Sequence, residues 1–183
     1  MTDTTAQYDA IVADCKSVFL HKNKDYGTAW RILRPTSLTD QLYIKARRIR
    51  SIQEKGAQQV ADSVQAEFIG IVNYSVLALI QLSLPEAAPL DLSAAKAEAL
   101  YDQYIGQARA LMLAKNHDYG EAWRDMRVSS MTDLILMKLL RIKQIEDNNG
   151  QTLISEGLEA NYLDIINYAI FTLIIQNEKQ HVT

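Results

Sequence analysis

The chain contains one ten-residue stretch twice. "KNKDYGTAWR" spans residues 22–31 and "KNHDYGEAWR" spans residues 115–124, so eight of ten letters agree at an offset of 93 residues. The same offset pairs Tyr8 with Tyr101, and it becomes 94 at Asn73 and Asn167 after one inserted residue. A repeat of this length requires a fold built from two copies of one unit.

The repeat sets the predicted organisation of the chain. The parts, in chain order, are a first helical repeat at residues 8–82, a linker with the start of a helix at 83–100, and a second helical repeat at 101–176. The linker contains Pro85 and Pro89, which favour a break between helices.

Each unit is predicted to contain three helices. Apolar residues from Tyr8 to Phe19 recur at i, i+3 and i+4, and those from Tyr101 to Met112 repeat this spacing. No stretch alternates with period two, so the predicted class is all-α. Two such units can bury their apolar faces against each other about a pseudo-two-fold axis, as a dimer fused within one chain. Further oligomerisation is left open.

The second helix of each unit has a predicted start. Ser37-Leu-Thr-Asp40 and Ser130-Met-Thr-Asp133 resemble capping boxes, and we interpret the two Asp residues as helix caps. Gly56 and Gly150 are expected to end the second helices. The third helices are expected to turn residues from Val60 onward, and from Ile154 onward, toward the core.

Composition limits the partners and the compartment. The net charge is -3 and the pI about 5.6, so we do not expect the chain to bind a nucleic-acid duplex. Cys15 is the single cysteine, which excludes an internal disulfide and a cysteine-based zinc site. The N-terminal residues are polar, and each apolar stretch is shorter than a membrane span and contains an Asn. We therefore expect a soluble, cytoplasmic protein with no membrane partner.

Two interpretations of the repeated loop are open. In the structural one, Gly120 adopts a positive φ, Asp118 caps a turn and Trp123 closes the end of the bundle. In the other, cations beside aromatic rings hold a small-molecule nucleotide. This second interpretation assigns to the ligand the residues Lys115, Asp118, Tyr119, Trp123 and Arg124.

The second helix carries a further basic pair in each copy. Lys138 and Arg141 are three residues apart, as are Lys45 and Arg48, so each pair lies on one helical face and could hold a polyphosphate. The alternative is a solvated basic face.

Acidic residues distinguish the third helix of the second copy. Glu156, Glu159, Asp164 and Asn167 fall within about 140° of one face at 100° per residue. Carboxylates are the ligands that Mg²⁺ prefers, so the three acids are predicted metal ligands and catalytic residues, with Asn167 in the substrate site. The alternative is that the acids are solvated and the Asn ties helices together. The matching residues of the first copy are Asp62, Gln65, Gly70 and Asn73.

The strings "KNHDYGEAW", Ser-x-x-Asp, Lys-x-x-Arg-Ile and "LDIINYAIF" resemble the nucleotide modification associated domain 1 family of bacteria and phages. The resemblance covers most of residues 101–176 and, more loosely, 8–82, and it implies an association with nucleotide metabolism. The chain is more distantly similar to all-α nucleoside triphosphate pyrophosphohydrolases of the MazG and dimeric dUTPase type. Those proteins carry Glu-x-x-Glu and Glu-x-x-Asp on successive helices, whereas here the helix before Glu156 is basic.

Three hypotheses follow. The first is a Mg²⁺-dependent hydrolase of nucleoside triphosphates in nucleotide metabolism or modification, with phosphates on Lys138 and Arg141 and the base on Tyr119 and Trp123. The second is a non-catalytic nucleotide-binding or regulatory module that uses the same basic and aromatic residues. The third is a structural helical adaptor.

Overall fold

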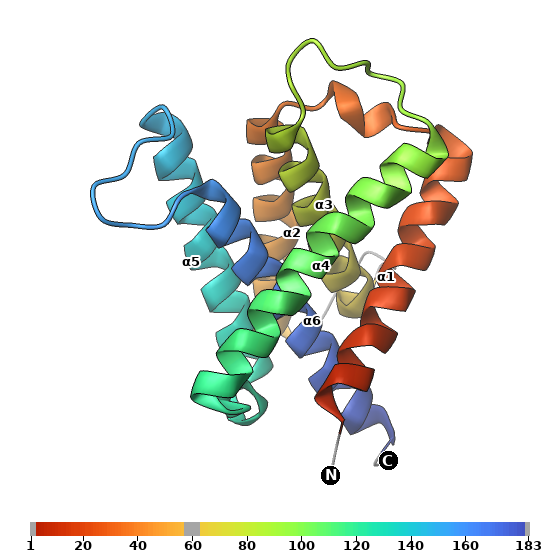
Figure 1. Ribbon diagram of the computed structural model, residues 1–183. Helices are drawn as coiled ribbons and strands as arrows, with labels where there is room; N and C mark the ends of the chain where they lie inside the picture. The colour runs from red at the N-terminus through yellow and green to blue at the C-terminus, as the bar shows by residue number, and fades with distance from the viewer. Residues whose placement is uncertain (1–2, 57–62, 182–183) are drawn as a thin grey trace.

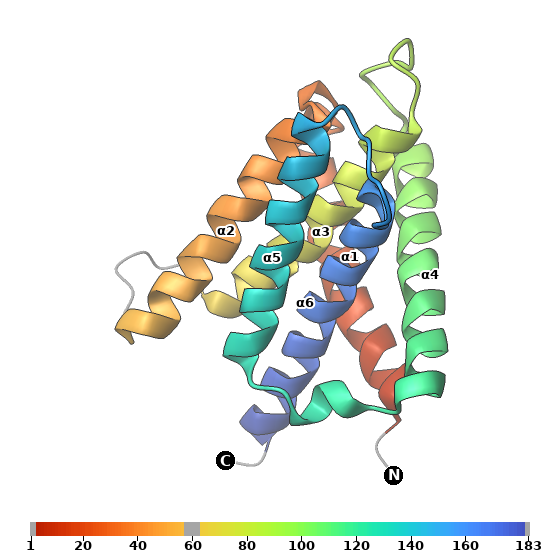
Figure 2. The same ribbon diagram turned by 90° about the vertical axis from the view of Figure 1, so that its left-hand side faces the viewer.

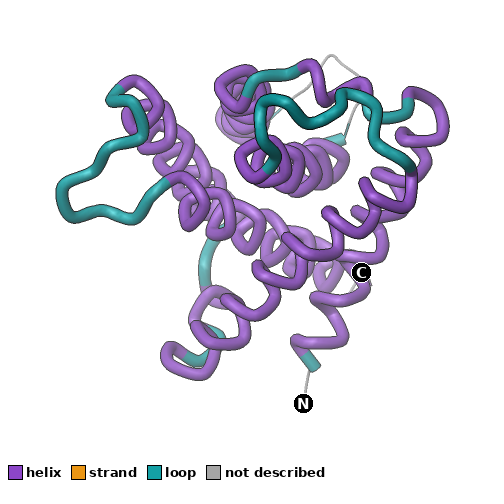
Figure 3. Tube along the Cα trace, turned by 45° about the horizontal axis from the view of Figure 1, so that its top comes forward, coloured by secondary structure: helices purple, strands orange, loops and turns teal. Residues whose placement is uncertain are grey.

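The computed structural model describes residues 3–56 and 63–181, which form helices and no strand (Figures 1 and 3). The elements are α1 (Thr4–Tyr26), η1 (Ala29–Ile32), α2 (Pro35–Lys55), α3 (Val64–Ser83), α4 (Ala94–Tyr119), η2 (Ala122–Asp125), α5 (Val128–Asp147) and α6 (Leu158–His181), where η marks a 3-10 helix. The predicted all-α class with two tandem three-helix repeats is confirmed.

The matching helices of the two copies pack together. Helix α3 packs against α6, α2 packs against α5, and each second helix packs against the third helix of its own copy. These four helices form the centre of the bundle, and in Figure 2 α4 lies along one side of it. Both α1 and α4 contact α3 and α6, so each first helix also spans the two copies. This is the predicted pseudo-two-fold bundle.

Apolar stripes of all six α-helices make the core. Fully buried residues recur every three or four positions along each second helix: Leu38, Leu42, Ala46 and Ile49 on α2, and Met131, Ile135, Leu139 and Ile142 on α5. Burying one such side chain stabilises the fold by roughly 1.5–3 kcal/mol relative to exposure, so the stripe is the main reason that these amphipathic segments stay helical.

Two buried Asn residues tie the copies to each other. Each Asn amide nitrogen donates to a carbonyl of its own first helix, and each Asn amide oxygen accepts from a Tyr hydroxyl of the other copy. The four bonds are Asn73 Nδ2 to Cys15 O at 3.0 Å, Asn167 Nδ2 to Ala108 O at 3.0 Å, Tyr101 to Asn73 Oδ1 at 2.7 Å and Tyr8 to Asn167 Oδ1 at 2.7 Å. All four side chains are buried, so these polar groups satisfy one another.

The predicted capping boxes are wrong. Helix α2 begins at Pro35 and α5 at Val128, earlier than expected, and neither has a side-chain cap. Asp40 and Asp133 therefore lie inside their helices rather than at the ends.

These two aspartates instead join the second helices of the two copies. Asp40 accepts from Lys143 at 2.8 Å, and Asp133 pairs with Arg50 at 3.5 Å. The two ion pairs occupy matching positions and are mostly exposed, so they set the register of α2 against α5 more than they stabilise it.

The helix ends confirm some expectations and change others. Gly56 ends α2 in the left-handed conformation, with φ 67°, and Gly150 has φ 79° in the loop after α5. Helix α6 begins only at Leu158, so Ile154 lies in that loop, fully exposed, and not in the core as expected. Val60 and Asp62 lie outside the described residues.

Helices α3 and α6 are long and apolar enough to cross a membrane by length and composition, contrary to the expectation from the sequence. Most of the apolar part of each is buried inside the bundle, as in the core helices of soluble proteins, so the two helices are weak evidence for a membrane.

A polar chain crosses the α2–α5 interface. The hydroxyls of Tyr162 and Thr39 lie 2.5 Å apart, and Thr39 donates to Glu146 at 2.7 Å. Burial raises the pKa of the Glu146 carboxyl; the Thr39 bond and Lys143 oppose this rise, while the charges of the neighbouring aspartates add to it. The matching contact in the other half joins Gln53 to Thr132 at 3.0 Å, with a neutral amide in place of the carboxyl.

We expect Tyr8→Phe and Tyr101→Phe each to lower the free energy of unfolding by about 1 kcal/mol or more, because each leaves a buried Asn oxygen without its donor. Urea denaturation measures the effect. Tyr26→Phe is the control, since that ring is 72% exposed. Unchanged midpoints for both buried variants would contradict the role of the Asn–Tyr bonds.

We expect Glu146→Gln to raise the denaturation midpoint at neutral pH. Because the folded-state pKa is raised, the ionised carboxyl disfavours folding, and wild-type stability falls as pH rises from the ordinary glutamate pKa toward the raised value. The gain from the variant should therefore shrink below the ordinary pKa. The converse change Gln53→Glu should lower the midpoint, and a lower midpoint for Glu146→Gln at neutral pH would refute this account.

Candidate functional site

Asp164 of the second copy lies between two lysines from two other helices. Lys115 near the end of α4 reaches one carboxylate oxygen at 2.6 Å, and Lys138 on α5 reaches the other at 2.7 Å. Asp164 and Lys138 are buried, whereas the Lys115 side chain is 47% exposed. The cluster thus begins at a buried ion pair and opens to solvent at Lys115.

The electrostatics keep Lys115 charged. Burial alone lowers the pKa of its ammonium group, but the hydrogen bond and charge of Asp164 outweigh burial and raise it, with a further contribution from Glu156. The Tyr168 hydroxyl, beside the cluster on α6, has a raised pKa because of burial and the Asp164 charge, so it is a neutral donor at physiological pH.

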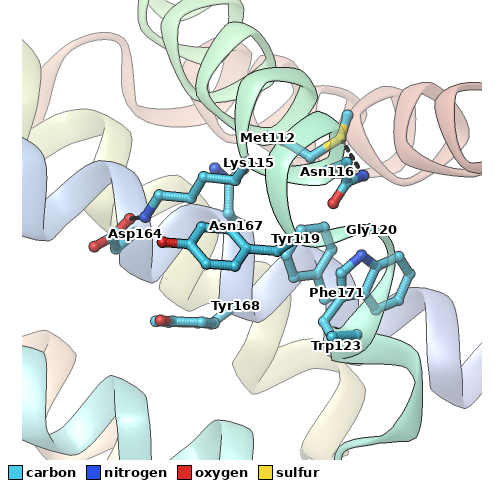
Figure 4. A pocket seen from close by; sticks show the side chains of 11 residues that line it. Met112, Lys115, Asn116, Tyr119, Gly120, Trp123, Asp164, Asn167, Tyr168 and Phe171 are labelled. Atoms are coloured by element: carbon cyan, nitrogen blue, oxygen red, sulfur yellow. Dashed lines mark hydrogen bonds and ion pairs between the residues drawn. The ribbon is translucent and has the colours of Figure 1, made fainter.

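A pocket of about 130 Å³ adjoins the cluster, between α4, η2 and α6 (Figure 4). We call it the aromatic pocket. Its lining residues are Met112, Lys115, Asn116, Tyr119, Gly120, Ala122, Trp123, Asp164, Asn167, Tyr168 and Phe171. Tyr119 is 77% exposed at its rim, and Phe171 forms part of its floor. An apolar space with a few polar groups at one side is the usual form of a ligand site.

Trp123 presents its edge to this pocket rather than a face. Phe171 stacks on the indole, with ring centroids 4.2 Å apart, and the Arg124 guanidinium lies 4.4 Å from the ring centroid. At these distances the two neighbours cannot share one face, so both faces are covered. The expectation that a base stacks on Trp123 is therefore not supported, and the exposed ring of Tyr119 is the available stacking surface.

The indole nitrogen of Trp123 has no hydrogen-bond partner in the described part of the chain, although the residue is 7% exposed. In Figure 4 this nitrogen is turned to the side of the pocket where Asn116 and Tyr119 lie. Leaving a buried donor unpaired costs about 1–3 kcal/mol. A ligand acceptor in the pocket would recover that cost.

A second, larger pocket of about 670 Å³ lies under the loop between α5 and α6. We call it the loop pocket. It is lined by Arg141, Gln144, Ile145, Asn148, Asn161 and the loop residues 151–156. Asn161 and Asp164 are one turn apart on α6, so the two pockets are neighbours along that helix.

The three predicted metal ligands do not form a set. Glu156 lies in the loop and Glu159 in the first turn of α6, both exposed, whereas Asp164 is buried between its lysines. Within residues 3–56 and 63–181, no group of three His, Cys, Asp or Glu side chains is placed to hold a metal ion. A carboxylate that already has two ammonium partners is a poor Mg²⁺ ligand, so these residues do not fit the predicted magnesium site.

Arg124 belongs to the scaffold rather than to either pocket. Its guanidinium donates to Glu178 at 2.8 Å on α6, and to Thr4 at 2.7 Å and Gln7 at 2.6 Å on α1. These bonds fix the repeated loop to both ends of the chain. Its equivalent Arg31 is also buried and bonds carbonyls of the linker, which explains why the loop keeps an Arg in both copies.

The other predicted residues divide between the pockets and the surface. Asp118 is 71% exposed beside His117 and lines neither pocket. Asn167 lines the aromatic pocket, but its amide already bonds Tyr8 and the Ala108 carbonyl, in agreement with the helix-tying alternative.

Sequence reasoning left the role of three residues of the aromatic pocket unassigned. These are Asn116, Tyr168 and Phe171. The recurrence of Asn23 with Asn116, and of Tyr74 with Tyr168, was a usable signal for the first two.

The first copy arranges the same charges differently. Gly70 stands where the second copy has Asp164, and the Lys45 chain lies against it, with Nζ 5.2 Å from the centre of the Tyr74 ring. The carboxylate sits one turn earlier, at Glu67, which pairs with Lys45 at 3.6 Å and Arg48 at 3.0 Å. Lys45 therefore occupies the space that the Asp164 side chain takes in the second copy.

A family model described as nucleotide modification associated domain 1 matches the chain twice, at residues 22–82 and 115–175. Comparisons with curated proteins and with solved structures give no match. The two matched segments begin at the repeated loops and end in α3 and α6, and the second contains every lining residue of the aromatic pocket except Met112.

We expect Asp164→Asn to lower the free energy of unfolding by about 3 kcal/mol or more, because Lys138 loses its counter-charge while remaining buried. Denaturant unfolding measures the change. Asp118→Asn makes the same substitution at an exposed position and should leave the midpoint unchanged. Equal midpoints for the two variants would show that the buried lysine does not depend on Asp164.

Proposed function

Because the chain belongs to the nucleotide modification associated domain 1 family through both of its halves, we propose that its second copy is a nucleotide-binding module. The nucleotide lies at the junction of α4, α5 and α6, across the aromatic and loop pockets. The observation that supports this most is the exposed, positively charged Lys115 beside a pocket with an unpaired buried donor.

The charge balance of the junction favours an anion. The two pockets are lined by the cations Lys115 and Arg141 and by the carboxylates Asp164 and Glu156, and Lys138 adds a third cation through its ion pair with Asp164. Lys138 is committed to Asp164 by burial. The phosphates are therefore assigned to the exposed groups, Lys115 and Arg141, where an incoming oxygen gains charge-assisted hydrogen bonds.

Binding fits the site better than metal-dependent hydrolysis does. A hydrolase of the predicted kind needs several carboxylates directed at one ion, and Asp164 already forms ion pairs with Lys115 and Lys138. The same groups suit a binding module, since the lysine pair holds the carboxylate in a fixed position and Lys115 stays cationic.

The test compares two lysines at matching positions of the repeat. Lys115→Ala should weaken the binding of nucleoside triphosphates about tenfold or more and leave nucleoside binding unchanged, because only the former offer phosphate oxygens. Lys22→Ala removes the same charge from the first copy, where Gly70 replaces the carboxylate, and should change neither. Calorimetry with a panel of nucleotides, with and without Mg²⁺, provides the affinities.

Equal losses for triphosphates and nucleosides, or equal losses in both variants, would refute a phosphate role for Lys115. Pyrophosphate release is measured on the same panel. Pyrophosphate release by the wild-type protein that Asp164→Asn abolishes would support the hydrolase hypothesis instead.

A further inference from the structure

The unpaired indole N–H of Trp123 is the strongest unexplained feature of the molecule. It is buried, belongs to a side chain that lines the aromatic pocket, and has no acceptor in the described part of the chain. The neighbouring Asn116 amide nitrogen donates to the Met112 sulfur at 3.1 Å, and its amide oxygen has no partner among the described residues. The pocket therefore offers a donor and an acceptor to a ligand edge.

The size of the aromatic pocket limits the ligand that can enter it. An apolar cavity of roughly 150 Å³ holds one benzene molecule, and the aromatic pocket measures about 130 Å³. A single six-membered ring matches this volume, whereas the second ring of a purine would extend beyond it toward the exposed rim at Tyr119. Tyr119 and Tyr168 line the pocket, so an inserted ring meets aromatic surface.

We propose that the aromatic pocket is the base subsite of the nucleotide site and selects pyrimidines, with a ring carbonyl accepting from Trp123 Nε1. This inference rests on the proposed function, which puts the phosphates on Lys115 and Arg141. A pyrimidine carries a carbonyl on a ring of the required size, and it satisfies the one buried donor that the pocket leaves open.

The covered faces of Trp123 make this an edge interaction. With Phe171 and Arg124 packed on the indole, the ring is held in place before a ligand arrives. The donor is thus fixed in direction, and a fixed donor discriminates between ring edges better than a mobile one.

The first copy provides an internal control. Trp30 matches Trp123, and its indole nitrogen is likewise buried without a partner among the described residues. There, however, Lys45 lies against Gly70 and over Tyr74, the positions that correspond to Asp164 and Tyr168. Lys45 therefore covers the positions that correspond to two lining residues of the aromatic pocket in the second copy.

The two tryptophans are the only ones in the chain, so ¹H–¹⁵N spectra contain two indole N–H resonances. Trp123→Phe and Trp30→Phe assign them and serve as matched variants, since each keeps an aromatic ring and removes one N–H. The probes are uridine, thymidine, adenosine, guanosine and the corresponding triphosphates.

We expect the pyrimidine nucleosides to shift the Trp123 resonance and the purine nucleosides to leave it in place. The pyrimidine triphosphates should shift the same resonance at lower concentrations. Trp123→Phe should weaken pyrimidine triphosphate binding about tenfold, the value of one buried hydrogen bond. Trp30→Phe should leave binding unchanged.

The remaining outcomes distinguish the proposed base subsite from the proposed nucleotide-binding function. If triphosphates bind through Lys115 but the Trp123 resonance stays in place, or purines shift it equally, the base subsite is refuted and the nucleotide-binding module stands. If pyrimidine nucleosides shift it and triphosphates bind no more tightly, the base subsite stands and the phosphate role fails. If no nucleoside or nucleotide binds, both proposals are refuted.

Discussion

The fold depends on hydrogen bonds that each half makes to a buried side chain of the other. Each copy contributes one Asn to the centre of the bundle, and each Asn accepts a hydrogen bond from the hydroxyl of a Tyr in the other copy. In an apolar interior the buried amides and hydroxyls have no alternative partners, so neither half satisfies its own polar groups alone. The apolar faces of α3 and α6 bring the halves together, and the Asn–Tyr bonds give that contact one register.

Much of this architecture was predictable because the duplication and the apolar periodicity depend on local spacing alone. The starts of the second helices were not predictable in this way, because the helices that begin at Pro35 and Val128 have no side-chain cap. Asp40 and Asp133 instead form contacts between the two copies. The predicted start of α6 was also wrong. Ile154 continues the apolar pattern, but the chain around it forms a loop.

The sequence pointed to charged residues that the fold brings together in the candidate site, but not to how they pair. The sequence singled out Lys115, Lys138 and Asp164, but helical spacing shows which residues share a face and not which helices face each other. Three acids on one side of a helix therefore suggested a metal site. In the fold, α4 and α5 direct their lysines at the one buried acid, and the other two acids stay in solvent.

On the proposed function, the different placement of one carboxylate in each copy decides how many ligands one chain takes. A symmetric pair of identical units would present two equal sites and bind two molecules. Here Lys45 packs against Gly70 in the first copy, whereas Asp164 holds Lys115 and Lys138 in the second, so the proposed site predicts one ligand for every two units. Under that proposal, substitutions in the first copy would alter the stability of the scaffold without altering what the second copy selects.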